Sequence, residues 1–449
     1  MKRMVFTIVL TSIILCPGSF AQKSWTLDDC ITYAVSNNIQ VKRQLLSTES
    51  LKADYTRSKL NMLPNLNLES DGNLGFGRSI DPVTNLITFH ENMSNSYSLN
   101  SSLNLFSGLS AINTLEANKY MVRAGLESEK IAINTLVVNI LGAYYQVLYT
   151  KGIENSAKAQ LSQSEKQLYR IRKNVETGKE AVSVEYEMES RVSEDRLNYT
   201  VAVNSTSQAI TELKQILELE PGSSFEVQMP SLDTVYIADE QYRPDSVFDI
   251  ASQVLPRLKE INYELRASEK QIAAAKGSIL PKLVVGGSIY TGYYEILGSG
   301  ATGQESFSSQ IRNNNSQSLS ARLQVPIFNN YSYARNIKLA KIKKNDTELK
   351  LELEKNNLYT DIENACLNYN RGKDEYLAAL SNFEYNKKSC EVLRKKFEAG
   401  LIDVTDYSAA SMNLFRAETE AERTRLQLMI RRLIIKFYST GDYRSVLNG

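Results

Sequence analysis

The stretch LPNLNLESDGNLGF at residues 63–76 carries leucine, serine or glycine at every second position, with mostly polar residues between them. Side chains of a β-strand alternate between two faces, so this pattern predicts a strand with one apolar and one polar face. The same alternation returns at residues 97–105 and 318–325, whereas residues 283–294 are β-prone but less regular. We therefore predict four strands, at about 64–78, 93–106, 281–295 and 315–328.

Alternating strands of this length, about ten residues each, are typical of a transmembrane β-barrel. In the second strand Leu103 and Leu105 are expected on the apolar face and Asn104 on the polar one. An amphipathic soluble sheet would give the same pattern. A transmembrane barrel is favoured over a soluble sheet by an N-terminal signal sequence and by aromatic residues near the strand ends, namely Phe76, Tyr97, Tyr290, Tyr293 and Tyr294.

Four strands cannot close a barrel, because the smallest transmembrane barrels have about eight. An open sheet in lipid would leave edge groups unpaired, at a cost of several kcal/mol each. We therefore expect a barrel that is shared between chains. Twelve strands from three chains would enclose an aqueous lumen, which suits the polar face.

The chain is an internal duplication. Leu63-Pro64 matches Leu280-Pro281 at an offset of 217 residues, which predicts Pro64 and Pro281 as strand-entry anchors. Phe106 matches Phe328 at an offset of 222, as strand-exit anchors, and the same offset relates RKNVETG, ending at Gly178, to RKKFEAG, ending at Gly400. One five-residue change between otherwise constant offsets indicates duplication, because chance similarity would drift.

Long helices follow the strands in both halves. No proline lies between Pro82 and Pro221 or after Pro326, and apolar residues recur at helical spacing. A helix over residues 109–175 would be about 100 Å long, which suits a coiled coil or a helical barrel rather than a globular domain. Residues 131–148 are nearly apolar enough to cross a membrane. Because Asn134, Asn139 and Gln146 interrupt them, we favour a helix buried at a packed belt.

Composition argues against most other classes of protein. The 449 residues are 42% hydrophobic and 23% charged, which excludes a disordered chain and a polytopic helical membrane protein. Lys+Arg number 52 and Asp+Glu 51, so no basic excess points to nucleic acid. The single histidine is His90, and GSGATGQ at 298–304 lacks the Lys-Ser/Thr of a phosphate loop. We expect no enzyme activity and no catalytic residue, cofactor or metal site.

The N-terminus predicts export. Lys2 and Arg3 precede an apolar run that ends at Cys16, and Ser19-Phe20-Ala21 supplies small residues for cleavage after Ala21. Lipidation of Cys16 is the less favoured alternative, because lipoprotein processing requires a small residue before the cysteine and Leu15 is bulky. The three remaining cysteines, Cys30, Cys366 and Cys390, are predicted to be packing residues rather than a disulfide framework.

Each long helix ends at a predicted tip. Gly178 and Gly400 follow clusters of basic residues, which suit a helix C-terminus, and glycine can adopt the left-handed conformation of a helix stop. Thr405 or Asp403 can cap the returning helix. An ordinary turn without a partner explains this element too. Its recurrence in both halves, far from the strands, favours exposed docking tips at Gly178, Lys179, Gly400, Leu401 and Ile402.

With these features the sequence resembles the TolC-like outer membrane factor family, also called outer membrane efflux proteins. The resemblance rests on TLDDCITYAVSNN at residues 26–38, the two Leu-Pro strand entries, the phenylalanine exits and the paired RKxxExG motifs, and it covers nearly all of the mature chain. RKKFEAGLIDVTDYSAA at residues 394–410 is similar to the family's periplasmic helix–turn–helix tip.

The resemblance implies a mixed fold, in which a transmembrane barrel of four strands per chain and twelve per trimer continues into a periplasmic α-helical barrel of coiled-coil hairpins. The expected parts are a signal peptide (1–21), repeat 1 (22–217), an equatorial linker (218–245), repeat 2 (246–438) and a C-terminal equatorial tail (439–449). Repeat 1 would contain a short helix, a second helix, two strands and a long hairpin, and repeat 2 would contain strands and a hairpin.

It further implies a homotrimeric exit duct of a tripartite efflux or type I secretion system in the outer membrane, with a large periplasmic portion. The expected partners are outer-membrane lipid, a periplasmic adaptor (membrane fusion) protein and an inner-membrane pump of the RND or ABC type, with no nucleic acid. A periplasmic coiled-coil adaptor is the alternative. It is less favoured because adaptors carry one hairpin in a split lipoyl domain, and this chain has two hairpins and duplicated strands.

In the family an acidic residue six positions after the tip glycine lines the closed entrance. Asp406 matches it in repeat 2, whereas repeat 1 departs, with Val184 there and Glu185 next. We expect three copies of Asp406 to form an anionic ring. A solvated carboxylate in the first helical turn is the alternative, in which case Phe397 or Glu185 would form the constriction.

Overall fold

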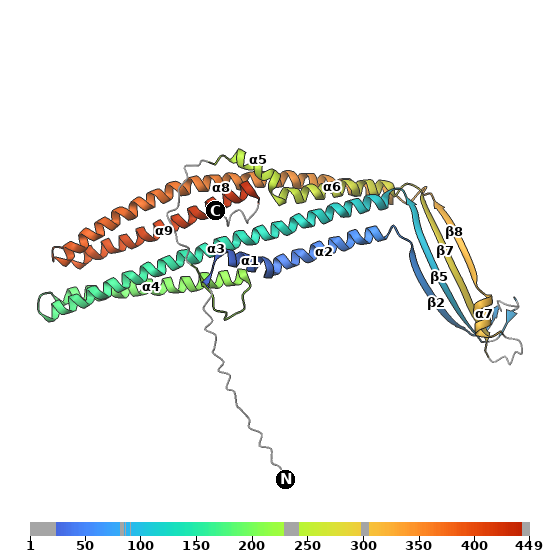
Figure 1. Ribbon diagram of the computed structural model, residues 1–449, viewed down its shortest axis with the longest axis horizontal. Coiled ribbons are helices and arrows are strands. Elements are labelled where there is room, and N and C mark those ends of the chain that lie inside the picture. Colours follow the sequence, from blue (N-terminus) through green and yellow to red (C-terminus); the bar gives the residue numbers. More distant parts are fainter. Residues whose placement is uncertain are drawn as a thin grey trace, which may run out of the picture.

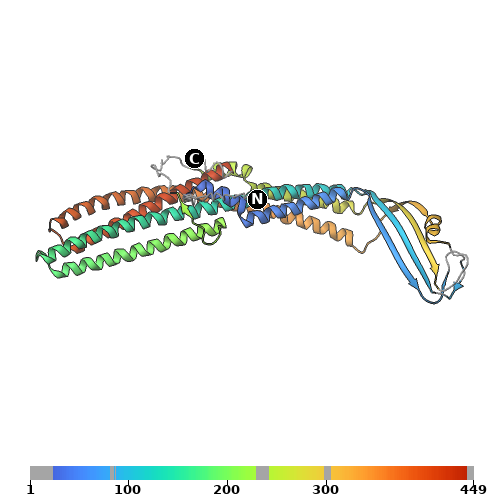
Figure 2. The ribbon, with the colours of Figure 1, turned by 60° about the horizontal axis from the view of Figure 1, so that its bottom comes forward.

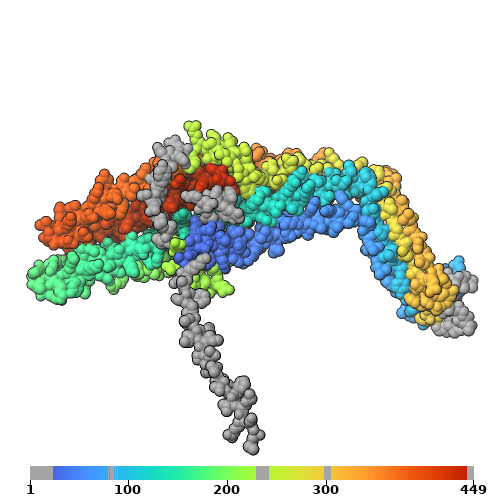
Figure 3. All heavy atoms as spheres, in the orientation of Figure 1, coloured from blue at the N-terminus to red at the C-terminus, as the bar shows by residue number. Residues whose placement is uncertain are grey.

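A computed structural model describes residues 24–80, 85, 87–89, 91–228, 242–297 and 305–441. The predicted signal peptide, Cys16, His90, the loop at 298–304, residues 229–241 of the predicted linker and residues 442–449 of the predicted tail lie outside these residues. The molecule is elongated, with a sheet at one end and two helical hairpins at the other (Figure 1). Both hairpin tips lie at the end farthest from the sheet, and α1 and the end of α9 lie near the middle (Figure 3).

The chain consists of two copies of one series of elements. The first copy is α1 (Leu27–Asn37), α2 (Ile39–Leu60), β2 (Asn65–Gly75), β5 (Asn92–Ser107), α3 (Ser110–Glu176) and α4 (Val182–Leu217). The second is α5 (Pro244–Val254), α6 (Pro256–Gly277), β7 (Lys282–Ile296), β8 (Ser316–Gln324), α8 (Ser332–Glu398) and α9 (Val404–Thr440). The offsets between the two copies are 217 residues before the strand loops and 222 after them, as the sequence predicts.

Shorter elements complete the described chain. The two-residue strands β1 (Ser24–Trp25) and β6 (Glu226–Val227) pair in parallel near the middle. A second small pair, β3 (Ser79–Ile80) and β4 (Ile87–Thr88), extends the β2–β5 hairpin, and the helix α7 (Phe307–Asn313) lies between β7 and β8. The sequence pattern did not predict α7.

The four long strands form one antiparallel sheet in the order β2-β5-β7-β8. Residues that pair across neighbouring strands share a face, so the register fixes the two faces. Leu99 pairs with Leu68 on one side and with Ile289 on the other, on the apolar face. Asn100 pairs with Asn67 and Ser288 on the opposite face. The alternation seen in the sequence is therefore an apolar face and a polar face of a single sheet.

Two details of the strands correct the sequence prediction. The register between β5 and β7 shifts between Asn104 and Phe106, so Phe106 rather than Leu105 pairs with Leu283 on the apolar face. Such a bulge inserts one residue and reverses the facing of every residue after it. β8 ends at Gln324, before Pro326, because proline cannot donate a ladder hydrogen bond. Phe328 therefore lies outside the strand, 83% exposed.

The chain turns from sheet to helix in the same way in both copies. Gly108-Leu109 and Asn330-Tyr331 all have positive φ, between 51° and 69°, and Leu109 and Tyr331 directly precede α3 and α8. Gly108 also lies against Gly277 at the end of α6, where a Cβ atom on either glycine would collide with the other's backbone. These two glycines allow the two copies to cross where the helices meet the sheet.

The long helices α3 and α8 each contain 67 residues, or about 100 Å of helix, and run from the sheet to the tips. Between the sheet and the middle of the molecule, the helices lie side by side in the order α2, α3, α6, α8. Beyond the middle, α3 packs against α4 and α8 packs against α9 (Figure 2). Of the described helices, only α3 and α8 therefore extend through both halves of the helical part.

The main core lies where these halves meet. Ile140, Tyr144 and Leu148 of α3 pack against Ile31 of α1 and Leu213 of α4. This part of α3 contains the apolar stretch that resembles a membrane span, and 44% of the 18 most apolar consecutive residues of the helix are buried inside the chain. The packed belt favoured from the sequence is thus what the structure has. The three cysteines of the described chain are free and buried, in agreement with a packing role.

Candidate functional site: the two hairpin tips

Both long helices end in the same hydrogen-bonded turn. At the first tip Gly178 N donates to Val175 O (2.9 Å) and Lys179 N donates to Asn174 O (2.8 Å). At the second, Gly400 N and Leu401 N make the equivalent bonds, of 3.0 and 2.9 Å. This is a Schellman motif, which needs a left-handed residue at the glycine position. The glycines have φ of 70° and 72°, which explains why both copies have glycine there.

The tip residues project into solvent. Lys179 is exposed, and Leu401 is 73% exposed although it is a large apolar residue. Ile402 is half-buried. Leu401 is therefore a large apolar side chain that is left in solvent at the end of the second hairpin.

Ion pairs stabilise the first tip and connect it to the second. Arg172 on α3 forms ion pairs with Glu185 (3.1 Å) and Glu189 on α4, within the first hairpin. Arg170 lies 3.8 Å from Glu398 on α8, which links the first hairpin to the second. These pairs are exposed, so each contributes at most about 1 kcal/mol.

An apolar cluster joins the two hairpins just behind the tips. Ile171 of α3 and Met188 of α4 pack with Val404 of α9, all of them buried. Phe397 stacks on Tyr407 with ring centroids 5.1 Å apart and an interplanar angle of 6°. The two tips of one chain are therefore held as a unit rather than as independent hairpins.

A polar layer follows the apolar cluster. Gln160 of α3 donates to Ser411 of α9 (2.6 Å) and lies 3.4 Å from Asp195 of α4. Asp195 is 2% exposed and forms an ion pair with Arg191 at 3.0 Å. Burial raises the pKa of the Asp195 carboxyl, and the neighbouring Arg191 charge opposes that shift. No pattern in the sequence predicts this layer, because its residues lie on three helices that are far apart in the chain.

The predicted constriction residues differ in how they are held. Asp403 caps α9 by accepting from the Asp406 backbone N–H (2.8 Å), and the Asp406 side chain is exposed, in no ion pair with a described residue. Glu185 is held by Arg172, and Phe397 is held by Tyr407. Val184, the counterpart of Asp406, packs in the apolar cluster. Of the three candidates, Asp406 is the one whose functional group is left to solvent.

The strand anchors lie elsewhere, at the junction of sheet and helices. Pro64 directly precedes β2, and Pro281 directly precedes β7. Phe106 lies one residue before the end of β5, where it pairs with Leu283, whereas Phe328 lies beyond the end of β8. No three His, Cys, Asp or Glu side chains of the described residues gather as metal ligands.

The fold and tips define a class of protein: an elongated chain with an amphipathic four-stranded sheet and two duplicated helical hairpins. The family model for outer membrane efflux proteins matches residues 248–436, which cover most of the second copy. The family resemblance seen in the sequence is confirmed over these residues, and the chain as a whole has the fold of solved outer membrane channels.

Three solved structures illustrate that likeness. The Campylobacter jejuni CmeC outer membrane channel has a TM-score of 0.77 at 15% identity, covering 94% of this chain and 88% of that one. A CusC structure has a TM-score of 0.75 at 18% identity, covering 94% and 91%. The open state of the Neisseria gonorrhoeae MtrE channel has a TM-score of 0.72 at 16% identity, covering 93% and 89%.

A curated relative agrees with these structures. Toxin and drug export protein A of Aggregatibacter actinomycetemcomitans is 19% identical over 328 residues, which is 71% of this chain and 66% of that protein. The chain thus spans about two thirds of the length of this relative.

Proposed function

We propose that three copies of this chain assemble into an exit duct across the outer membrane, serving a tripartite efflux or type I secretion system. The barrel would hold twelve strands, and the helices would form a tunnel through the periplasm. The observation that carries this proposal is the sheet itself, which has one apolar face, one polar face and two unpaired edges among the described strands.

The sheet and the helical layer have their open edges on the same two sides of the chain, which supports assembly with neighbouring copies through both layers. The sheet ends in β2 on one side and β8 on the other, and the adjoining helical layer ends in α2 and α8. The free helices expose large apolar residues: Leu46 and Leu60 on α2, and Leu349 and Leu353 on α8. One copy's α8 and β8 edge would therefore meet the next copy's α2 and β2 edge.

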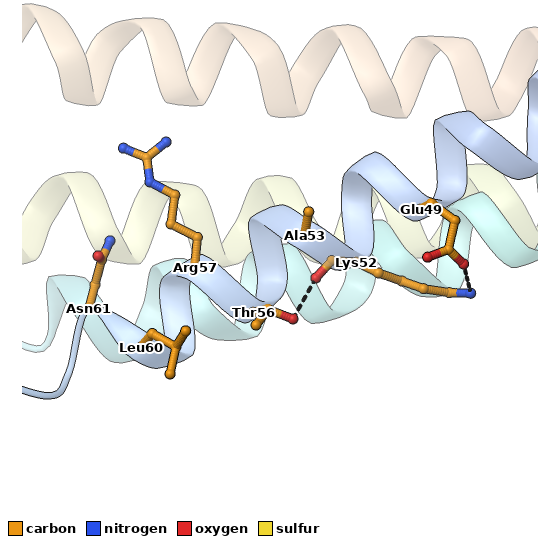
Figure 4. A pocket seen from close by; sticks show the side chains of 7 residues that line it. All are labelled: Glu49, Lys52, Ala53, Thr56, Arg57, Leu60 and Asn61. Carbon is orange, nitrogen blue, oxygen red and sulfur yellow. Dashed lines mark hydrogen bonds and ion pairs between the residues drawn. The ribbon is translucent and has the colours of Figure 1, made fainter.

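The outer surface of α2 suits such a contact. Ala53, Arg57 and Asn61 lie along one side of the helix around a shallow hollow, and Lys52 is held by Glu49 at 2.7 Å (Figure 4). Arg57 is in no ion pair with a described residue, so its guanidinium is available to a neighbouring copy. Arginine is enriched at interfaces between subunits, which is in keeping with a contact at Arg57.

The apolar and polar faces fix which side would meet lipid. Leu68, Leu99 and Ile289 would face the bilayer, and Asn67, Asn100 and Ser288 would line a water-filled lumen. Exported cargo would pass through such a lumen passively, without a chemical reaction, in keeping with the channels that share this fold.

The tips would dock a periplasmic adaptor, which connects the duct to an inner-membrane pump of the RND or ABC type. The exposed Leu401 supplies an apolar contact, and Lys179 supplies a charge. Asp406 would form the anionic ring of the closed entrance, with Phe397 and Glu185 behind it. Opening would be a rotation of α9 and the end of α8 away from the first hairpin, which separates the contact between Gln160 and Ser411.

Outer-membrane fractionation and planar-bilayer recording test this function together. The protein is expected in the outer membrane, with migration on gels that changes on heating, and purified protein is expected to form small cation-selective channels. A protein that fractionates with the periplasm and conducts no current would contradict a duct and support the adaptor alternative.

A further inference from the structure

The strands β7 and β8 differ in length at the end of the sheet away from the helices. β5 pairs with β7 as far as Ile296, but β8 pairs with β7 only as far as Tyr290. The last six residues of β7, 291–296, therefore have a strand on one side and no strand of the described chain on the other. An open edge of this kind is a template on which another strand can add.

The helix α7 occupies that edge. Gln310 Oε1 accepts from the Tyr294 backbone N–H, and Gln310 Nε2 donates to the Tyr294 carbonyl, both at 3.0 Å. Two such bonds to one residue are what an opposing strand makes at a hydrogen-bonded pair. The side-chain amide has one acceptor and two donor hydrogens, so Gln310 can imitate a peptide group.

Neighbouring contacts extend this substitution along the edge. Asn314 Nδ2 donates to the Gly292 carbonyl (2.8 Å), and the Thr291 hydroxyl donates to the Ile311 carbonyl (2.6 Å). The rings of Phe307 and Tyr293 meet edge to face, with centroids 5.1 Å apart. These contacts fix α7 on the strand on both sides of Gln310.

Gln310 itself is buried for this purpose. Its residue is 5% exposed, and its amide also donates to the Glu305 carbonyl at 3.0 Å. A buried amide whose acceptor and donors are all used is a specific device, because leaving any of these groups unpaired would cost about 1–3 kcal/mol.

We propose that α7 is a stop for strand pairing between copies of this chain. It stands in for a strand on the outer end of β7, so the β2 strand of a second copy can add to β8 but cannot continue onto β7. Gln310 is the residue that determines this specificity. The inference rests on the proposed trimer, in which β8 and β2 of neighbouring copies pair.

The test compares Gln310→Leu with Gln271→Leu in the purified full-length protein. At position 310 leucine removes both bonds to Tyr294 and the bond to the Glu305 carbonyl while keeping a similar volume. Gln271 is exposed on α6, away from the pairing edges of the sheet, and has no side-chain hydrogen bond to a described residue, so it controls for the change from amide to leucine. Asn314→Ala, at an exposed position, is a milder second variant that removes only the bond to Gly292.

Two quantities are measured: hydrogen exchange of the amides in residues 290–297, and the share of trimer against larger assemblies by mass photometry in detergent. In Gln310→Leu we expect the Tyr294 amide to exchange about fivefold faster, as the loss of one hydrogen bond implies. The ratio of larger assemblies to trimer should rise at least about threefold, since an open edge recruits strands. Asn314→Ala should shift both quantities in the same direction but less, and Gln271→Leu should match the wild type.

Faster exchange with an unchanged share of trimer would overturn the proposal, because the contact would then be a local tie only. Unchanged exchange would overturn it as well. A wild type that is monomeric would instead overturn the proposed trimer, so the two failures are distinguishable.

Discussion

The sharpest test of the sheet is a charge placed at its centre on either face. Leu99 lies midway along β5, between Leu68 and Ile289, which are 75% and 44% exposed. If this face meets lipid, Leu99→Arg places a guanidinium near the bilayer midplane. Arginine on the lipid face of a barrel costs about 2–4 kcal/mol at that depth.

The matched control is the next residue along the strand. Asn100 points to the opposite face, between Asn67 and Ser288, where Asn100→Arg would enter the proposed aqueous lumen at little cost. Both variants add one positive charge per chain and introduce the same side chain. The difference between them therefore reports the facing of the strand.

In the proposed trimer the cost is incurred once per copy. Three copies of Leu99→Arg should cost about 6–12 kcal/mol per assembled barrel, a loss of at least about 10⁴-fold in the folding equilibrium. Refolding into lipid vesicles, followed by the gel band that shifts on heating, measures the folded fraction. We expect Leu99→Arg to abolish this band and Asn100→Arg to retain it. Equal folding of the two variants would refute the assignment of the faces.

Three further outcomes follow from the hairpins. Gly400→Arg, which needs a left-handed arginine costing about 1–2 kcal/mol, should spare the trimer but abolish drug export and adaptor crosslinking; Gly222→Arg, equally strained but away from the tips, should retain both. Asp406→Asn should weaken cation selectivity and block by a trivalent cation from the periplasmic side in planar bilayers, and unchanged block would make Asp406 a solvated carboxylate only. Burial raises the pKa of Asp195, so the folded chain holds a proton that the unfolded chain releases, and helix stability should fall as the pH rises from about 4 through the raised pKa. In circular dichroism melts, the stability of Asp195→Asn should depend less on pH than that of the wild type. An equal slope of stability against pH in the two proteins would contradict this.

The features that the sequence predicts are those written in short-range patterns. Alternation along residues 63–76 marks a strand with two faces, and the register of β2 against β5 preserves it. The duplication fixes equal offsets, so the matching glycines at 178 and 400 end matching helices. These signals need no knowledge of which segments meet in space.

The features that it misses depend on contacts between distant segments. The bulge after Asn104 appears only when β5 is set against β7, and it places Phe106 where Leu105 was expected. The ion pair of Arg191 and Asp195 looks like an ordinary helical pair until α3 and α9 bury it. The helix α7 is short and polar, so its sequence resembles a loop.

If three copies of the chain close one barrel, as we propose, the assembled protein must have the mass of three chains. Native mass spectrometry of the mature protein, released from detergent, should give a single species at three times the mass of one chain. The Leu99→Arg variant should fail to give this species, and Asn100→Arg should give it. A folded, stable monomer in the wild-type spectrum would contradict the account, because four strands with two open edges cannot cross a membrane alone.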